Sequence, residues 1–219
     1  MAAVTVRVPA KINIYLGVGP ATATGFHDLA TVFQAVSVYD EVTVSLADTM
    51  AIQVRGPWAH VVPADDSNLA WRAARLVADA AASDCQFDID IDKAIPVAGG
   101  LAGGSADAAA ALVACNEVLG APLEWGMLEE IAAQLGSDVP FLLHGGCALG
   151  TGRGIELAPV MTRGSFHWVL ATFTEGLSTA DIYAAVDRLR GPDFDTLPEV
   201  PADVLRALAQ GDAALLGAS

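Results

Sequence analysis

The stretch Pro96–Ala106, which reads PVAGGLAGGSA, constrains this chain most, because two glycine pairs stand directly before an alanine-rich segment that favours a helix. Glycine lacks a Cβ atom, so its backbone can adopt unusual angles and approach a ligand closely. The first N–H groups of a helix have no partner within the helix and carry partial positive charge. A glycine-rich bend that runs into a helix therefore predicts a cradle for phosphate groups.

This loop differs from the two commonest nucleotide-binding motifs. The glycines stand in adjacent pairs, Gly99-Gly100 and Gly103-Gly104, so the G-x-G-x-x-G spacing of dinucleotide-binding folds is absent. Gly99 and Gly104 have the glycine spacing of a P-loop, but Ser105 stands where that motif needs a lysine. The alternative to a phosphate loop of another kind is an ordinary glycine-rich turn before a buried helix.

The composition limits the classes of partner. Of the 219 residues, 53% are hydrophobic and 17% are charged, which is typical of a folded protein. The net charge of −15 disfavours nucleic acid as a partner. No apolar run reaches the roughly 20 residues that cross a bilayer. The three cysteines lie in apolar settings without metal-type spacing, which predicts buried free thiols and a cytoplasmic protein: Cys85, Cys115 and Cys147.

Strand and helix patterns mix without strict alternation, which predicts an α+β fold. Alternating or β-prone segments predict strands at 4–8 and 12–18, with a break at Pro9, and at 33–46, 87–91 and 167–173. Helical patterns predict helices at 67–82, with Ser67 as the N-cap, and at about 105–119, 124–135 and 178–189. We expect a loop at 191–201 and a change of domain near 159–165.

Two charged residues are candidates for chemistry. Lys11 either lays its stem along the protein surface or provides a fixed cation beside a reacting oxygen. Asn13 has the same strand phase as Lys11, so both side chains should leave one face. Asp138 either caps a turn or accepts a proton from a substrate hydroxyl.

Other polar residues leave alternatives open. Ser105 could cap the helix or ligate Mg²⁺, which phosphoryl transfer needs together with phosphate positioning and a base. His27 could hydrogen-bond a nucleobase or close a turn. The remaining histidines have no metal-type spacing, and we interpret them as structural: His60, His144 and His167.

Several segments together resemble a known family, the GHMP kinases. In chain order they are PAKINIYL, GFHDLATVFQAVSVYDEV, SNLAWRAA, IPVAGGLAGGSADAAAAL and LGSDVPFLLHGG, with TGRGIEL as a further match. The resemblance extends to about Asp187. The combination of PAKIN, GFHDL and GSDVPF is similar to the members that phosphorylate a cytidine diphosphate-linked alcohol in non-mevalonate isoprenoid synthesis. It implies an ATP-dependent small-molecule kinase with an N-terminal domain at 1–160 and part of a C-terminal domain at 161–219.

The resemblance also implies residue roles. Asp138 would be the catalytic base, and Lys11 would stabilise the developing charge beside it. The adenine side of ATP would contact Asn68 and Lys93. The cytidine substrate would contact Asn13, Phe26, His27, which would read the cytosine, and Tyr183, which would stack on it. The ATP phosphates, with Mg²⁺, would be held by Pro96, Val97, Ala98, Gly99, Gly100, Leu101, Ala102, Gly103, Gly104, Ser105 and Ala106.

One departure from the family concerns the C-terminus. Members of the family are longer and carry a second glycine-rich segment there, and nothing like it occurs in this chain. We therefore expect a fragment whose second domain is incomplete, and a monomer or weak homodimer. The competing hypotheses are another GHMP kinase, such as a homoserine or mevalonate kinase, a non-catalytic nucleotide-binding module, and a scaffold protein with a glycine turn.

Overall fold

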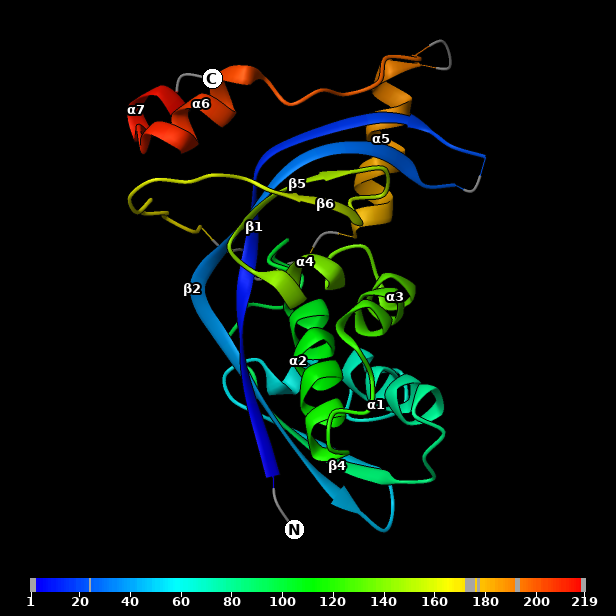
Figure 1. The fold of residues 1–219 in the computed structure, drawn as a ribbon. Coiled ribbons are helices and arrows are strands. Elements are labelled where there is room, and N and C mark those ends of the chain that lie inside the picture. The colour runs from blue at the N-terminus through cyan, green and yellow to red at the C-terminus, as the bar shows by residue number, and fades with distance from the viewer. Residues whose placement is uncertain (1–2, 24, 172–175, 177, 192–193, 218–219) are drawn as a thin grey trace. The chain divides into compact units, whose positions relative to one another are not determined.

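The chain divides into two compact units that are each discontinuous in sequence. The computed structural model describes residues 3–23, 25–171, 176, 178–191 and 194–217. The first unit holds Met1–Lys11 and Ala35–His144, and the second holds Ile12–Gln34 and Gly145–Ser219. Two long strands, β1 (Ala3–Ala21) and β2 (His27–Ala47), contribute residues to both units (Figure 1).

The first unit contains a sheet whose alternation follows the sequence. The later part of β2 pairs in antiparallel fashion with β4 (Gln86–Asp92), and β4 pairs in parallel with β3 (Ala51–Arg55). Every second residue of β4 is buried, namely Phe87, Ile89 and Ile91. The strand predicted at 87–91 is thus confirmed, and its end leads the chain toward the glycine-rich loop.

Four α-helices complete the described part of the first unit. They are α1 (Leu69–Ala80), α2 (Gly103–Val118), α3 (Trp125–Leu135) and α4 (Val139–His144), with a short 3-10 helix at Ala59–Val61. Figure 1 shows α2 between its helical neighbours, and α1, α3 and α4 all pack against it. Because its neighbours bury nearly every residue from Ala106 to Cys115, α2 is apolar all round rather than along one stripe.

The second unit contains three paired strand segments and a small core. Residues Thr31–Gln34 of β2 pair with β5 (Cys147–Thr151), and β5 pairs with β6 (Glu156–Pro159), both in antiparallel fashion. The described helices are α5 (Thr179–Arg190), α6 (Ala202–Gln210) and α7 (Ala213–Leu216). Val32, Val204 and Leu208 form a buried cluster.

The α+β fold class and the four predicted helices are confirmed, but two local predictions are wrong. Asn68 rather than Ser67 caps α1, because the Asn68 Oδ1 accepts a hydrogen bond from the Ala70 N–H, whereas the Ser67 hydroxyl donates to Asp65. Strand β1 runs through Pro9 without a break. Proline lacks a backbone N–H, so it is tolerated in an edge strand. Strand β1 pairs with β2.

The strand predicted at 167–173 is also wrong where the structure describes it. Residues 167–171 join no sheet, and the Val169 side chain is 98% exposed. A β-prone segment becomes a strand only when a neighbouring strand satisfies its N–H and C=O groups. Thr172 and Phe173 lie outside the described residues.

Several short elements had no clear sequence signal, namely β3, β5, β6, α4, α6 and α7. The loop expected at 191–201 is irregular wherever it is described, up to the start of α6 at Ala202; residues 192 and 193 lie outside the described part. The two compact units are not the contiguous ranges 1–160 and 161–219, because β1 and β2 contribute residues to both units. The assignment of 1–160 and 161–219 as the family's N-terminal and C-terminal domains stays a prediction.

The state of the cysteines and the lengths of the helices can be compared with the expected buried free thiols and with the expectation that no apolar run crosses a bilayer. All three cysteines are free thiols, with Cys115 buried and Cys85 and Cys147 half-buried. Across the described part of the chain, every helix is too short or too polar to cross a lipid bilayer.

Candidate active site

The glycine-rich loop has the backbone geometry of a ligand-binding segment. Ala98, Gly100 and Ala102 all have positive φ angles, of 57°, 72° and 56°. Only one of the three is a glycine, so two alanines adopt a left-handed conformation that costs energy and that clusters at ligand-binding sites. Residues 98–100 are exposed, whereas Leu101 is buried and anchors the loop.

The N-terminus of α2 has no side-chain cap. Ala102 occupies the N-cap position, and no side chain accepts a hydrogen bond from the first turn there. Ser105 is the third residue of the helix, so the structure does not support the alternative in which its hydroxyl caps α2. The uncapped first turn of the 16-residue helix offers backbone N–H groups to an anion.

Lys11 and Asp138 converge beside this loop, although 126 positions (138 − 11 − 1) separate them in the sequence. The Lys11 Nζ lies 3.6 Å from the Asp138 Oδ2. The Lys11 backbone N–H donates to the Leu101 carbonyl in the loop, at 3.2 Å. Asp138 precedes α4, and its carbonyl accepts from the Leu142 N–H. The Lys11 side chain is 8% exposed and the Asp138 side chain 32%, so the carboxylate keeps an open side.

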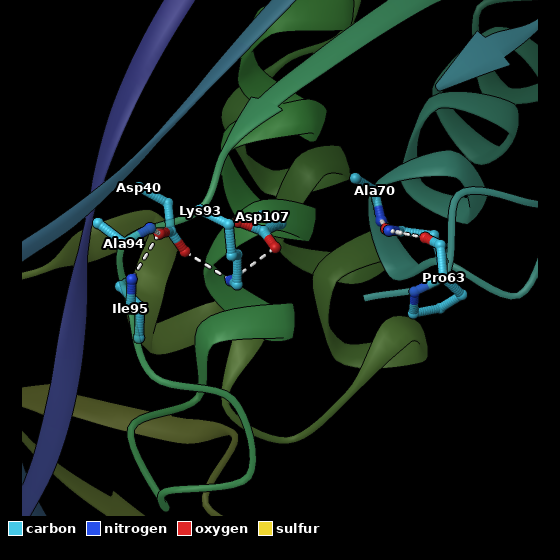
Figure 2. Close-up of polar contacts among 8 residues, drawn as sticks. Asp40, Pro63, Ala70, Lys93, Ala94, Ile95 and Asp107 are labelled. Carbon is cyan, nitrogen blue, oxygen red and sulfur yellow. Dashed lines mark hydrogen bonds and ion pairs between the residues drawn. The ribbon is translucent and has the colours of Figure 1, made fainter. Parts of the chain in front are cut away.

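The side chain of Lys93, a residue expected at the adenine side of ATP, is buried between two aspartates. Its Nζ lies 2.6 Å from the Asp40 Oδ2 and 2.7 Å from the Asp107 Oδ2 (Figure 2). The side chains of Lys93, Asp40 and Asp107 are 1%, 0% and 2% exposed. The Lys93 ammonium is therefore sealed from a ligand in this structure, because two carboxylates and the protein interior surround it.

Burial has a further electrostatic consequence in this triad of Asp40, Lys93 and Asp107. Burial is the largest cause that raises the pKa of Asp107 to about 7. The positive charge of Lys93 acts to lower this pKa, and the negative charge of Asp40 acts to raise it. The Asp107 Oδ1 has no hydrogen-bond partner among the described residues. One buried cation thus faces two buried carboxylates, one of which is incompletely satisfied.

Asn68, the second residue expected near the adenine, also uses its side chain for structure. Its Oδ1 caps α1 through the Ala70 N–H at 2.9 Å, and its Nδ2 donates to the Pro63 carbonyl at 2.8 Å. Figure 2 shows these bonds to Pro63 and Ala70. The buried amide therefore fixes the start of α1, and the contact of Asn68 with the adenine side of ATP stays a prediction.

The second unit brings together two of the residues expected at the cytidine substrate. The His27 Nε2 lies 2.9 Å from the Asp187 Oδ1, and the His27 ring lies 5.0 Å from the Tyr183 ring between centroids. Phe26 is exposed, and the Arg153 guanidinium lies over its ring at 4.6 Å. The Asn13 Nδ2 donates to the Thr31 hydroxyl at 2.7 Å.

Sequence reasoning missed three carboxylates, and each had a usable signal. Asp187 follows Tyr183 by four positions, so both occupy one face of a helix and can meet the same neighbour. Asp40 and Asp107 each stand within apolar or β-prone segments, where a buried charge calls for a partner.

Known proteins resemble this chain closely. A family model described as the GHMP kinases N terminal domain matches residues 68–146, which contain the glycine-rich loop and Asp138. A relative from Mycolicibacterium vanbaalenii is 57% identical over 218 residues, or 97% of this chain and 67% of the relative. A relative from Mycobacterium tuberculosis is 53% identical over 209 residues, or 95% of this chain and 66% of the relative. The chain belongs to the GHMP kinase family.

The names of the relatives are more specific than the family. Both are called 4-diphosphocytidyl-2-C-methyl-D-erythritol kinase. A crystal structure of 4-(cytidine 5'-diphospho)-2C-methyl-D-erythritol kinase aligns with a TM-score of 0.70 and 32% identity, covering 95% of this chain and 72% of that chain. A homoserine kinase from Cytophaga hutchinsonii aligns with a TM-score of 0.62 at 16% identity, over 99% of this chain and 70% of that one, which shows the shared fold alone. The chain spans about two thirds of the length of its curated relatives.

Proposed function

We propose that this protein transfers the γ-phosphoryl group of ATP to the 2-hydroxyl of 4-diphosphocytidyl-2-C-methyl-D-erythritol, a step of non-mevalonate isoprenoid synthesis. The observation that carries the proposal is the pairing of Lys11 with Asp138 beside the glycine-rich loop. The names of the relatives, at 53–57% identity, support the choice of substrate.

The chemistry follows from the positions of these two side chains. The Asp138 carboxylate accepts the proton of the acceptor hydroxyl as its oxygen attacks the γ-phosphorus. The new O–P bond forms while the bond from the γ-phosphorus to the bridging oxygen breaks, and ADP leaves with the electron pair. The Lys11 ammonium stabilises negative charge on the acceptor oxygen and the transferred phosphoryl group.

The glycine-rich loop, Pro96–Ala106, supplies the phosphate contacts in this proposal. Its exposed backbone and the uncapped first turn of α2 present N–H groups to the nucleotide. Mg²⁺ would neutralise charge on the ATP phosphates, and it commonly takes only one or two protein ligands beside those phosphates and water. The Ser105 hydroxyl, in the first turn of α2, is an oxygen donor of the kind that Mg²⁺ prefers.

We further propose that residues of the second unit bind the cytidine part. Because the His27 Nε2 faces the Asp187 carboxylate, the ring is held in place, and its Nδ1 remains as the atom for a nucleobase hydrogen bond. Tyr183 offers aromatic surface next to His27, and Asn13 and Phe26 complete the proposed substrate residues. Cytoplasmic location and a monomeric or weakly dimeric state stay predictions.

The test is a coupled assay of ADP release with ATP, Mg²⁺ and a panel of acceptor alcohols. We expect rapid turnover with 4-diphosphocytidyl-2-C-methyl-D-erythritol and little turnover with homoserine or mevalonate. Preference for another acceptor would refute the proposed substrate but would leave the proposed kinase activity in place. ATP binding without transfer of a phosphoryl group to any acceptor would refute the proposed kinase activity and would favour a nucleotide-binding module.

A further inference from the structure

We propose that the buried triad of Asp40, Lys93 and Asp107 positions the glycine-rich loop for nucleotide phosphates. This inference rests on the proposed kinase function of the same loop. Lys93 lies three positions before Pro96, where the loop begins, and Asp107 directly follows Ala106, where it ends. The triad therefore joins the two ends of the loop through one ammonium group.

Asp40 holds the entry of the loop. Its Oδ1 accepts hydrogen bonds from the backbone N–H groups of Ala94 and Ile95, at 2.7 and 2.8 Å, while its Oδ2 accepts from Lys93 (Figure 2). Lys93 is also fixed by its backbone, since its N–H donates to the Arg55 carbonyl at 2.8 Å. The residues that lead into Pro96 are thus tied to β2 and to the end of β3.

Lys93 also contacts the exit of the loop. A Cβ atom at Gly103, the first residue of α2, would lie 2.8 Å from the Lys93 Nζ and 3.1 Å from the Ile95 Cγ2. Glycine is needed at this position because the ammonium packs directly on the helix backbone. Asp107 in α2 adds the second carboxylate, so entry and exit meet at the same buried cation.

Rigid ends matter here because the loop itself is strained and exposed. Left-handed conformations at Ala98 and Ala102 persist only where the surroundings enforce them. A loop already held in its binding conformation loses less conformational freedom when phosphates bind, so pre-organisation raises affinity. Surface ion pairs hold geometry weakly, whereas a buried pair with short hydrogen bonds holds it strongly.

The test compares two cations that each face two aspartates. Lys93→Met removes the buried one, and Arg55→Met removes an exposed one that pairs with Asp90 and Asp92. For Lys93→Met we expect the KM for ATP and the dissociation constant for ADP to rise about tenfold, as the loop loses its pre-organisation. In Lys93→Met the KM for the acceptor alcohol should stay within about twofold of the wild-type value. Arg55→Met should match the wild type in the KM for ATP, the dissociation constant for ADP and the KM for the acceptor alcohol.

A second variant separates positioning from stability. Lys93→Met/Asp107→Leu removes the cation and one buried carboxylate together, and apolar replacement of a buried ion pair commonly restores stability. We expect its Tm to return toward the wild-type value while its ADP dissociation constant stays raised. If the ADP affinity recovers together with Tm, or if Lys93→Met binds ADP as the wild type does, the proposal is overturned.

The ADP measurement uses isothermal titration and needs no phosphoryl transfer. A wild-type protein that binds ADP but is inactive would therefore count against the proposed kinase activity alone. The positioning role of the triad would still be tested by the ADP affinities of its variants. A wild type that does not bind ADP would overturn the positioning role as well.

Discussion

The first unit contains two lysine–aspartate sites that have the same functional groups but differ in distance and burial. At Lys11 and Asp138 the charged atoms are 3.6 Å apart and the carboxylate is partly open to solvent. At Lys93 one ammonium contacts two fully buried carboxylates at 2.6 and 2.7 Å. The comparison teaches that the accessibility of the carboxylate, rather than residue type, distinguishes the pair proposed to react from the buried triad.

The physical reason lies in how each charge is satisfied. A buried carboxylate without a cation loses its hydration and gains nothing in return, so the partners of Lys93 hold it in place. Asp138 retains solvent contact and a looser partner, so its oxygens remain available to a substrate hydroxyl. Variants at the two sites should therefore affect different properties, and each prediction below tests that separation.

The largest expected effect is on turnover at the open site. Asp138→Asn keeps the size of the side chain and removes its ability to accept the proton, so turnover should fall by about 10²–10⁴-fold. The free energy of unfolding should change little, because the carboxylate is partly exposed. Steady-state ADP release and urea unfolding measure the two quantities, and near-wild-type turnover would remove Asp138 as the base.

The next effect is on stability at the buried site. Lys93→Met leaves two carboxylates without their cation, and breaking a buried ion pair in this way costs about 3–5 kcal/mol of unfolding free energy. Urea unfolding followed by circular dichroism measures the loss. Arg55→Met, at an exposed ion pair, is the matched control and should unfold like the wild type; an equal loss in both variants would refute the contrast.

A smaller effect is expected from the cation at the open site. Lys11→Ala should lower turnover by about 10²–10³-fold, as expected when a group that stabilises transition-state charge is removed. The KM for ATP should change less than kcat, because the lysine acts on the reacting oxygens rather than on nucleotide binding. A variant that changes only the KM for ATP would place Lys11 among the nucleotide contacts instead.

The last prediction concerns pH and the buried triad. Because burial raises the pKa of Asp107 from 3.8 to about 7, the folded protein holds a proton there that the unfolded chain releases at lower pH. This carboxyl therefore makes the unfolding free energy fall as pH rises between those two values, with Lys93 and Asp40 as the facing charges. Asp107→Asn removes the dependence, so its stability relative to the wild type should increase from about pH 4 to about pH 7 and then level off. A constant difference in urea unfolding across this range would contradict the shift.

Local patterns in the sequence were enough for the principal elements. The apolar periodicity and the terminal glycine predicted the helix that ends at Leu135, and the alternation of FDIDI predicted β4. Lys11 and Asp138 were candidates from their settings, and the family resemblance joined them. Such features were readable because propensity, capping and alternation act between residues that are close in the sequence.

Other features depended on contacts that no local pattern contains. Lys93 and Asn68 are predicted nucleotide contacts, and only the fold shows that their side chains bond to Asp40, Asp107, Pro63 and Ala70. Residues 167–171 are β-prone in sequence but join no sheet. The sequence by itself determined the glycine-rich loop, the four longest helices and the chemical groups available. Only the tertiary structure decided that the Asp138 carboxylate stays partly open while the Lys93 ammonium is sealed between two carboxylates, because burial arises from contacts between segments that are distant in the chain.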